Sequence, residues 1–150
     1  MKSFVLMFAS LVMLVSSVSG FSTYVSTSGS TLSITTTYGS PHWYSGINLA
    51  PGNYLAYVDL LDANLSGASL SGANLTGAIL VTTNLTDADL SNANLTGAIL
   101  LDTNLTDADL SNANLTGAIL LDTNLTDADL SNASLSGANL TGAILVTTNL

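Results

Sequence analysis

The chain has 150 residues, enough for one domain, with 7% charged residues, no cysteine and a formal net charge of −9. All ten acidic residues are Asp, and the only basic residue is Lys2. Because Lys and Arg bind most phosphate groups, this composition excludes direct nucleic-acid binding and disfavours binding to anionic lipid headgroups. The missing cysteine excludes disulfides, so packing and hydrogen bonds must hold the fold together.

Residues 1–20 have the pattern of a secretory signal peptide: a basic start, an apolar run and a small-residue end. The apolar run, Phe4–Val18, is short for a bilayer crossing, which disfavours the alternative of an uncleaved membrane anchor. We expect cleavage after Gly20 and export to a periplasmic, extracellular or lumenal compartment. After cleavage we expect no membrane contact.

Residues 21–52 form a Ser/Thr-rich aromatic leader. The alternation in "STLSITTTYG" predicts a strand, and Pro51-Gly52 marks a turn before the pattern changes. We expect the leader to cap the structure that follows, against the alternative of a disordered segment. The candidate lid residues are Trp43, Tyr44, Tyr54 and Tyr57.

Residues 53–150 carry a repeat of five residues. Leu65 to Leu150 are eighteen leucines in a row at this spacing, and Ala or Thr stands two residues before each. The unit is A-[ND]-L-x-x, and residues 94–113 recur without change at 114–133. A period of five fits neither the 3.6-residue period of a helix nor the two-residue period of a flat strand, since both would leave leucines exposed.

A coil that turns a corner every five residues buries all the leucines. Gly, Asn, Asp and Ser crowd the two positions after Leu, where a turn needs residues that tolerate unusual φ values. The longer period of twenty predicts four sides per coil, with successive coils about 4.8 Å apart as in paired strands. Stacking then supplies the core.

The stretch "ANLSGASLSGANLTGAIL" resembles the pentapeptide-repeat family, and the resemblance covers Ala63–Leu150. It implies an all-β fold: a right-handed, four-sided (quadrilateral) parallel β-helix solenoid, here with a short N-terminal cap. It also implies that the central Leu and the small residue two positions before it face inward.

The C-terminal end of the repeat differs in its register. Residues 133–150 repeat residues 68–85 at an offset of 65, which is thirteen units and no multiple of four. We therefore expect Ile144 one side along from the column of Ile79, Ile99 and Ile119. We also expect the β-helix to be truncated at residue 150, or to continue through a partner.

An apolar stripe is predicted on one outer side of the solenoid. It combines residues before and after the central leucines at a period of twenty: Ile79, Val81, Ile99, Leu101, Ile119 and Leu121. Exposed apolar patches usually mark interfaces, so we interpret the stripe as a docking site for a second copy or another protein. The alternative is drift copied by duplication.

Two polar arrays recur at the same period. Asp columns begin at Asp87, Asp89 and Asp102; a solvated surface is favoured over calcium binding, because no Asp-rich loop has cation-binding spacing. Asn-Leu-Thr ladders, such as Asn84 to Thr86, resemble the surfaces of some ice-binding proteins. They also contain the N-glycosylation signal, as a by-product of the repeat.

Catalysis has no residues to support it. Glu is absent, and the one imidazole, His42, stands beside Trp43 with nothing to position Ser40 or Ser45 as a nucleophile. No catalytic, cofactor or metal residue is assigned, and the chain is predicted to be no enzyme.

We therefore favour an exported, non-catalytic solenoid that acts as a structural or protein-interaction scaffold. One alternative comes from the same family, of which certain cytosolic members resemble DNA in shape and charge and bind topoisomerases. The acidic surface fits this alternative, while the export signal and the short rod argue against it. The other alternative is an ice- or surface-binding β-helix.

Overall fold

The computed structural model describes residues 5–8, 11–14, 22–25, 31–36, 52 and 54–150. Strand β1, Val5–Phe8, pairs antiparallel with β2, Leu11–Leu14. Both lie inside the predicted signal peptide, residues 1–20, which otherwise falls outside the described residues. The signal peptide stays a prediction.

A small antiparallel sheet joins the leader to the repeat. It has the order β3, Ser22–Val25; β4, Thr31–Thr36; and β5, Ala63–Asn64. The strand predicted from the Leu32 and Ile34 alternation is therefore confirmed as β4. Because Thr35 pairs with Asn64 and Thr36 with Ala63, β4 lies along the first coil of the repeat.

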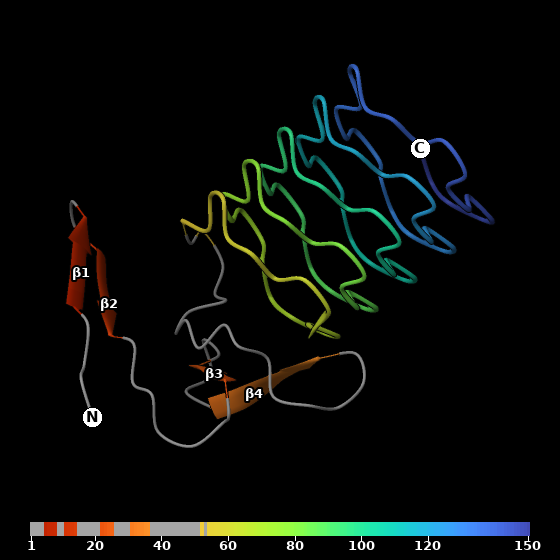
Figure 1. The fold of residues 1–150 in the computed structure, drawn as a ribbon. Coiled ribbons are helices and arrows are strands. Elements are labelled where there is room, and N and C mark those ends of the chain that lie inside the picture. Colours follow the sequence, from red (N-terminus) through yellow and green to blue (C-terminus); the bar gives the residue numbers. More distant parts are fainter. Residues whose placement is uncertain (1–4, 9–10, 15–21, 26–30, 37–51, 53) are drawn as a thin grey trace.

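The repeat forms a stack of coils, drawn in Figure 1 from yellow to blue. Sixteen isolated bridges join the coils; all are parallel, and each connects residues twenty apart, as Ile79 to Ile99. One coil therefore has four bridging positions, five residues apart. This confirms the predicted four-sided parallel β-helix.

The four sides are named here by their outward bridging residues. Face 1 carries Tyr54, Asn74, Asn94, Asn114 and Ser134; face 2 carries Asp59, Ile79, Ile99, Ile119 and Asn139; face 3 carries Asn64, Asn84, Asn104, Asn124 and Ile144; face 4 carries Ser69, Asp89, Asp109, Asp129 and Asn149. Faces 2 and 4 are half a coil apart and lie on opposite sides of the tube.

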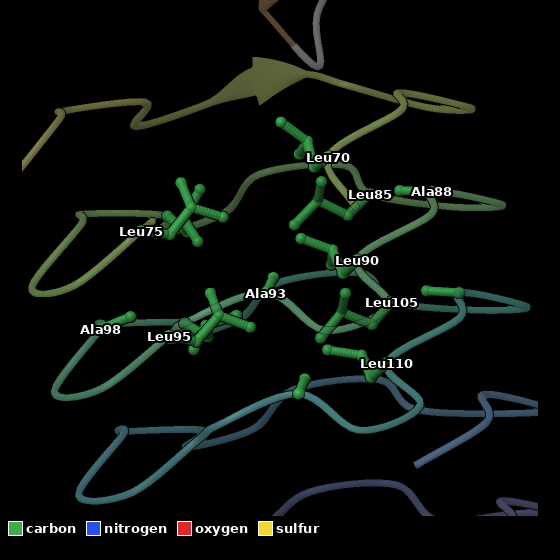
Figure 2. Close-up of a cluster of buried hydrophobic side chains, with 14 of the residues drawn as sticks. Leu70, Leu75, Leu85, Ala88, Leu90, Ala93, Leu95, Ala98, Leu105 and Leu110 are labelled. Atoms are coloured by element: carbon green, nitrogen blue, oxygen red, sulfur yellow. The ribbon is translucent and has the colours of Figure 1, made fainter. Parts of the chain in front are cut away.

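The predicted inward positions form the core. Leu and Ala alternate with the outward residues, so that Ala98 and Leu100 are fully buried on either side of the half-buried Ile99. Figure 2 shows the leucines of successive coils stacked inside the tube. At about 25 cal/mol per Å² of apolar surface, this burial is the main stabilising term.

Every corner contains one left-handed residue, which from Tyr57 onward stands two positions after the central Leu. The φ values run from 53° to 74° at all twenty such positions from Gly52 to Thr147. Eight are Gly, and the other twelve are Asn, Asp, Thr or Tyr. The sequence expectation that these positions tolerate unusual φ is therefore confirmed for the second of the two corner positions.

The two ends of the tube differ in burial. In the first coil Leu60, Leu65 and Leu70 are at most 1% exposed, whereas Leu145 and Leu150 of the last coil are 42% and 69% exposed. The lid prediction is wrong for Tyr54 and Tyr57, which are 64% and 75% exposed on the outside of the first coil.

The tyrosines miss the end of the tube for a local reason. Tyr54 occupies the outward bridging position of face 1, and Tyr57 occupies a corner. The Tyr57 ring lies along the next corner, where a Cβ on Gly77 would come within 2.7 Å of it. The other lid candidates, Trp43 and Tyr44, lie outside the described residues.

Candidate interaction surface

The predicted stripe lies on face 2 and on the edge that follows it. Ile79, Ile99 and Ile119 bridge one another in the parallel ladder. The corner position two residues after each Ile holds Val81, Leu101 or Leu121. Backbone hydrogen bonds hold these corners one above another, as the bond from Thr82 N to Leu101 O at 2.9 Å does. All six side chains are half-buried, in contrast to the fully buried leucines between them. The structure therefore brings the six predicted residues together.

The apolar surface extends further than the sequence analysis predicted. Leu61 stands twenty residues before Val81, is 41% exposed and continues the same edge. The twenty-residue period, extended back from Val81 into the first coil, would have identified Leu61 from the sequence. At the other end the register shift is confirmed, because Ile144 bridges to Asn124 on face 3 and not to Ile119.

A side-chain cap explains the Asn and Asp of the repeat. In each of twelve units, the Asn or Asp before the central Leu accepts the backbone N–H two residues later through Oδ1, as Asn104 accepts Thr106 N at 3.1 Å. The caps begin at Asp59, Asn64, Asn74, Asn84, Asp89, Asn94, Asn104, Asp109, Asn114, Asn124, Asp129 and Asn139. This N–H is the donor that neither the corner nor the next coil satisfies.

The Ile units lack this cap. An Ile side chain has no acceptor, so within the described residues no protein group accepts the backbone N–H of Val81, Leu101 or Leu121. The units of Tyr54, Ser69, Ser134 and Ile144 lack the cap as well. Face 2 is the side where three consecutive coils combine apolar side chains with uncapped donors along one edge.

Two of the three acidic columns lie away from face 2, and the third borders it. Asp89, Asp109 and Asp129 line face 4, and Asp87, Asp107 and Asp127 line the corner before it. Asp102 and Asp122 stand on the corner between faces 2 and 3, in a column that begins at Asp62. Stacked like charges repel by about 1 kcal/mol per pair in water, less in salt.

The electrostatics of face 4 are modified by the caps. The pKa of Asp129 is held below its ordinary value, chiefly because Ser131 N–H donates to its carboxylate at 2.9 Å. The Ser131 hydroxyl and the Asn149 amide lower it further, while partial desolvation opposes them. Within the described part of the chain, no three His, Cys, Asp or Glu side chains are grouped to hold a metal ion.

The Asn-Leu-Thr ladders are bonded to the tube itself. On face 3 the Thr106 hydroxyl donates to Asn104 Oδ1 at 2.7 Å, and Asn124 Nδ2 donates to Thr106 Oγ1 of the coil before at 3.0 Å. The ladder therefore links coils, and its hydroxyl protons are already donated. The residues weighed for catalysis, His42, Ser40 and Ser45, lie outside the described residues.

No helix among the described residues is long and apolar enough to cross a bilayer.

Comparison with known families gives one match. The model described as "Pentapeptide repeats (8 copies)" matches residues 52–80, 83–120 and 108–145, which together cover more than half of the chain. No curated protein matches the chain.

Solved structures give a consistent result. A pentapeptide repeat protein from the thylakoid lumen of Arabidopsis thaliana is 34% identical with a TM-score of 0.60, covering 61% of this chain and 64% of its own. HetL, a pentapeptide repeat protein involved in heterocyst differentiation regulation in the cyanobacterium Nostoc sp. strain PCC 7120, is 36% identical with a TM-score of 0.51 and covers 69% of this chain. The chain spans 61% of the length of HetL.

Proposed function

The chain belongs to the pentapeptide-repeat family, and we propose that it is an exported, non-catalytic scaffold that binds another protein through face 2. The tube is a rigid support, because its interior is filled with Leu and Ala and its coils are joined by backbone hydrogen bonds. The four faces differ in chemistry, and face 2 has the chemistry of a docking surface: apolar, with one charged residue, Asp59, in its bridging column.

The missing caps on face 2 carry the proposal. A cap of this kind contributes about 1 kcal/mol, and the twelve Asn and Asp units from Asp59 to Asn139 all keep it. Ile79, Ile99 and Ile119 give up that contribution and expose apolar surface instead. Residues that break a local rule in this way are found at functional sites, and the hydrogen-bonding pattern of the corner favours Asn at these positions.

Site-specific photo-crosslinking in the producing cells tests this function. A photoreactive residue at Leu101 on the face 2 edge should form a covalent product with a protein, either this chain or another. The same residue at Asp107, on the corner between faces 3 and 4, is the matched control and should form little. Equal labelling at both positions, or none at either, would contradict docking through face 2.

Export is the second part of the proposal. It is supported by the basic start and apolar run of residues 1–20 and by the similarity to a protein of the thylakoid lumen. The intact mass of the protein recovered from the compartment should equal that of a chain that begins at Phe21. A mass that retains Met1 to Gly20 would contradict cleavage.

The acidic columns support one alternative function, that of a DNA mimic that binds a topoisomerase. Face 4 and the corner before it carry two parallel columns of three Asp residues each. This rival predicts inhibition of DNA supercoiling by gyrase at micromolar protein. It also predicts loss of that inhibition when Asp107 and Asp109 become Asn, with no effect of face 2 substitutions.

The ladders of face 3 suggest the other rival, binding to ice or another crystal surface. Asn and Thr repeat there at the coil spacing, about 4.8 Å. This function predicts thermal hysteresis and inhibition of ice recrystallisation, both abolished by Thr106→Glu. Absence of both activities would remove this rival.

A further inference from the structure

We propose that the partner on face 2 is a second copy of this chain, with the two tubes side by side, parallel, and related by a two-fold axis along the tube. This inference rests on the proposed function, because it names the protein that face 2 binds. The charges, the repeat spacing and the two edges of the face support it, each independently.

Charge restricts how two copies can meet. Ten Asp residues and no basic residue other than Lys2 make any two copies repel. The Asp column of face 4 lies on the opposite side of the tube from the Ile column of face 2, since Asp109 and Ile99 are half a coil apart. Contact through face 2 therefore places the two face 4 columns as far apart as the tubes allow.

The spacing of the stripe suits an identical tube. Ile79, Ile99 and Ile119 recur at each coil, so their spacing equals the rise of the β-helix. A second copy presents the same spacing, and one match in register aligns all three coils at once. Under a two-fold axis along the tube, each coil of one copy then faces the equivalent coil of the other at the same height, along the whole face.

The two edges of face 2 decide the relative direction of the tubes. One edge carries the uncapped Leu101 N–H and the Asp102 carboxylate. The other edge carries Thr96, whose hydroxyl oxygen can still accept a hydrogen bond, and Gly97, which has no side chain. A two-fold axis along the tube brings unlike edges together, so that the donor edge of each copy meets the hydroxyl edge of the other.

The antiparallel arrangement lacks these advantages. A two-fold axis across the tube brings like edges together, which sets Asp102 against its own copy and leaves the donors of Leu101 facing each other. In the parallel arrangement, the one repulsive contact within the bridging columns is between the two Asp59 carboxylates, at one end of the face. Electrostatics and hydrogen bonding therefore both favour parallel tubes.

The size of face 2 makes the association weak. Five coils at about 4.8 Å give a face about 24 Å long, and three extended residues give a width of about 10 Å. This footprint is below the ~800 Å² per partner of a standard interface. We expect a dimer that is half-formed on the order of 0.1 mM.

Sedimentation equilibrium of the exported chain over a concentration series tests the second copy. The double variant Ile99→Asn, Ile119→Asn supplies the missing acceptors and should weaken the dimer at least about tenfold. The control is Ile144→Asn, which makes the same change in the same local sequence, "GAIL", but on face 3. It should shift the dissociation constant by less than about twofold.

The outcomes separate this inference from the proposed function. A wild-type chain that stays monomeric at about 1 mM overturns the second copy. If the Leu101 photo-crosslink then joins a different protein, docking through face 2 stands. If Ile144→Asn weakens the dimer as much as the face 2 variant does, the dimer exists but face 2 is the wrong surface.

The direction of the tubes is tested with introduced cysteines, since the chain has none of its own. Parallel tubes predict that a mixture of the Leu101→Cys and Thr96→Cys single variants is joined mainly as the mixed pair by a short thiol crosslinker. Leu101→Cys alone should be joined poorly. Efficient joining of Leu101→Cys to itself would overturn the parallel arrangement.

Discussion

Thr103 Oγ1 donates a hydrogen bond of 2.6 Å to the carbonyl oxygen of Leu80, twenty-three residues earlier and one coil below. Thr83 and Thr123 make the same contact with Leu60 and Leu100. These three Thr side chains are the polar members of the interior, and each is at most 1% exposed. They tie neighbouring coils together at the corner after face 2, where the cap is missing.

Replacing Thr103 tests this contact. The Leu80 carbonyl also accepts Thr83 N at 3.2 Å, so it keeps one partner when the hydroxyl is removed. Thr103→Val keeps the shape and should lower the free energy of unfolding by about 1 kcal/mol, measured by denaturant titration. Thr103→Ala should lower it somewhat further because it also removes a methyl group. An unchanged stability of the Val variant would show that the hydroxyl contributes nothing.

Thr82 is a residue in an unfavourable backbone conformation. It has a φ of 54° at a corner where Asp102 and Asp122 occupy the equivalent positions, and β-branched residues are disfavoured there. Thr82→Asn should raise the melting temperature, through a gain of about 0.5–1 kcal/mol. Thr86→Asn, at a corner position without positive φ, should give no such gain, because it relieves no strain and removes the hydrogen bond from the Thr86 hydroxyl to Asn84. A lower melting temperature for Thr82→Asn would mean that the hydrogen bond from Thr82 Oγ1 to Asp62 outweighs the strain.

The caps predict a stability cost that is independent of burial. Asn94→Ala removes the acceptor for Thr96 N at 3.1 Å and for the Thr96 hydroxyl at 2.6 Å. We expect a loss of about 1 kcal/mol in the free energy of unfolding, together with faster amide hydrogen exchange at Thr96. Ile99→Asn gains a cap but loses apolar contacts, and its stability should stay near that of the wild type.

The core should respond to cavities according to coil position. Leu100 is fully buried in the middle of the stack, whereas Leu140 is only partly buried in the last coil. Leu100→Ala should cost about 2–5 kcal/mol. Leu140→Ala should cost clearly less, because solvent already reaches this side chain. Equal losses would mean that the last coil is covered in solution.

Asp129 predicts a contribution to acid sensitivity. A carboxylate whose pKa is lowered on folding stabilises the fold above its unfolded pKa, about 3.9, and that contribution is lost as pH falls through the lower folded pKa. Ser131→Ala should therefore raise the Asp129 pKa in a carboxyl NMR titration. Asp129→Asn should flatten the decline in melting temperature below about pH 4. An Asp129 pKa unchanged by Ser131→Ala would show that the Ser131 hydroxyl is not among its causes.

The fold could be predicted from the sequence because its repeat has only one solution. Leu every fifth residue, with Ala or Thr two positions before, identified the inward positions, and the twenty-residue period set four sides per coil. The same reasoning placed Ile144 on a different face from Ile119. The stripe of face 2 followed from the same spacing, although Leu61 was overlooked.

The role of the Asn and Asp residues depended on the tertiary structure. Spacing showed where their side chains recur, but it did not show that each Oδ1 accepts an N–H two residues later, or that the Ile units leave that donor without a partner. The lid prediction failed for a related reason. Tyr54 and Tyr57 are aromatic residues suited to a cap, but the backbone of the first coil places both side chains on the outside of the tube. The period alone decides which residues enter the core, because hydrophobic burial is non-directional. Hydrogen bonds are directional, so the corner geometry had to be known before the caps, and with them the exceptional character of face 2, could be recognised.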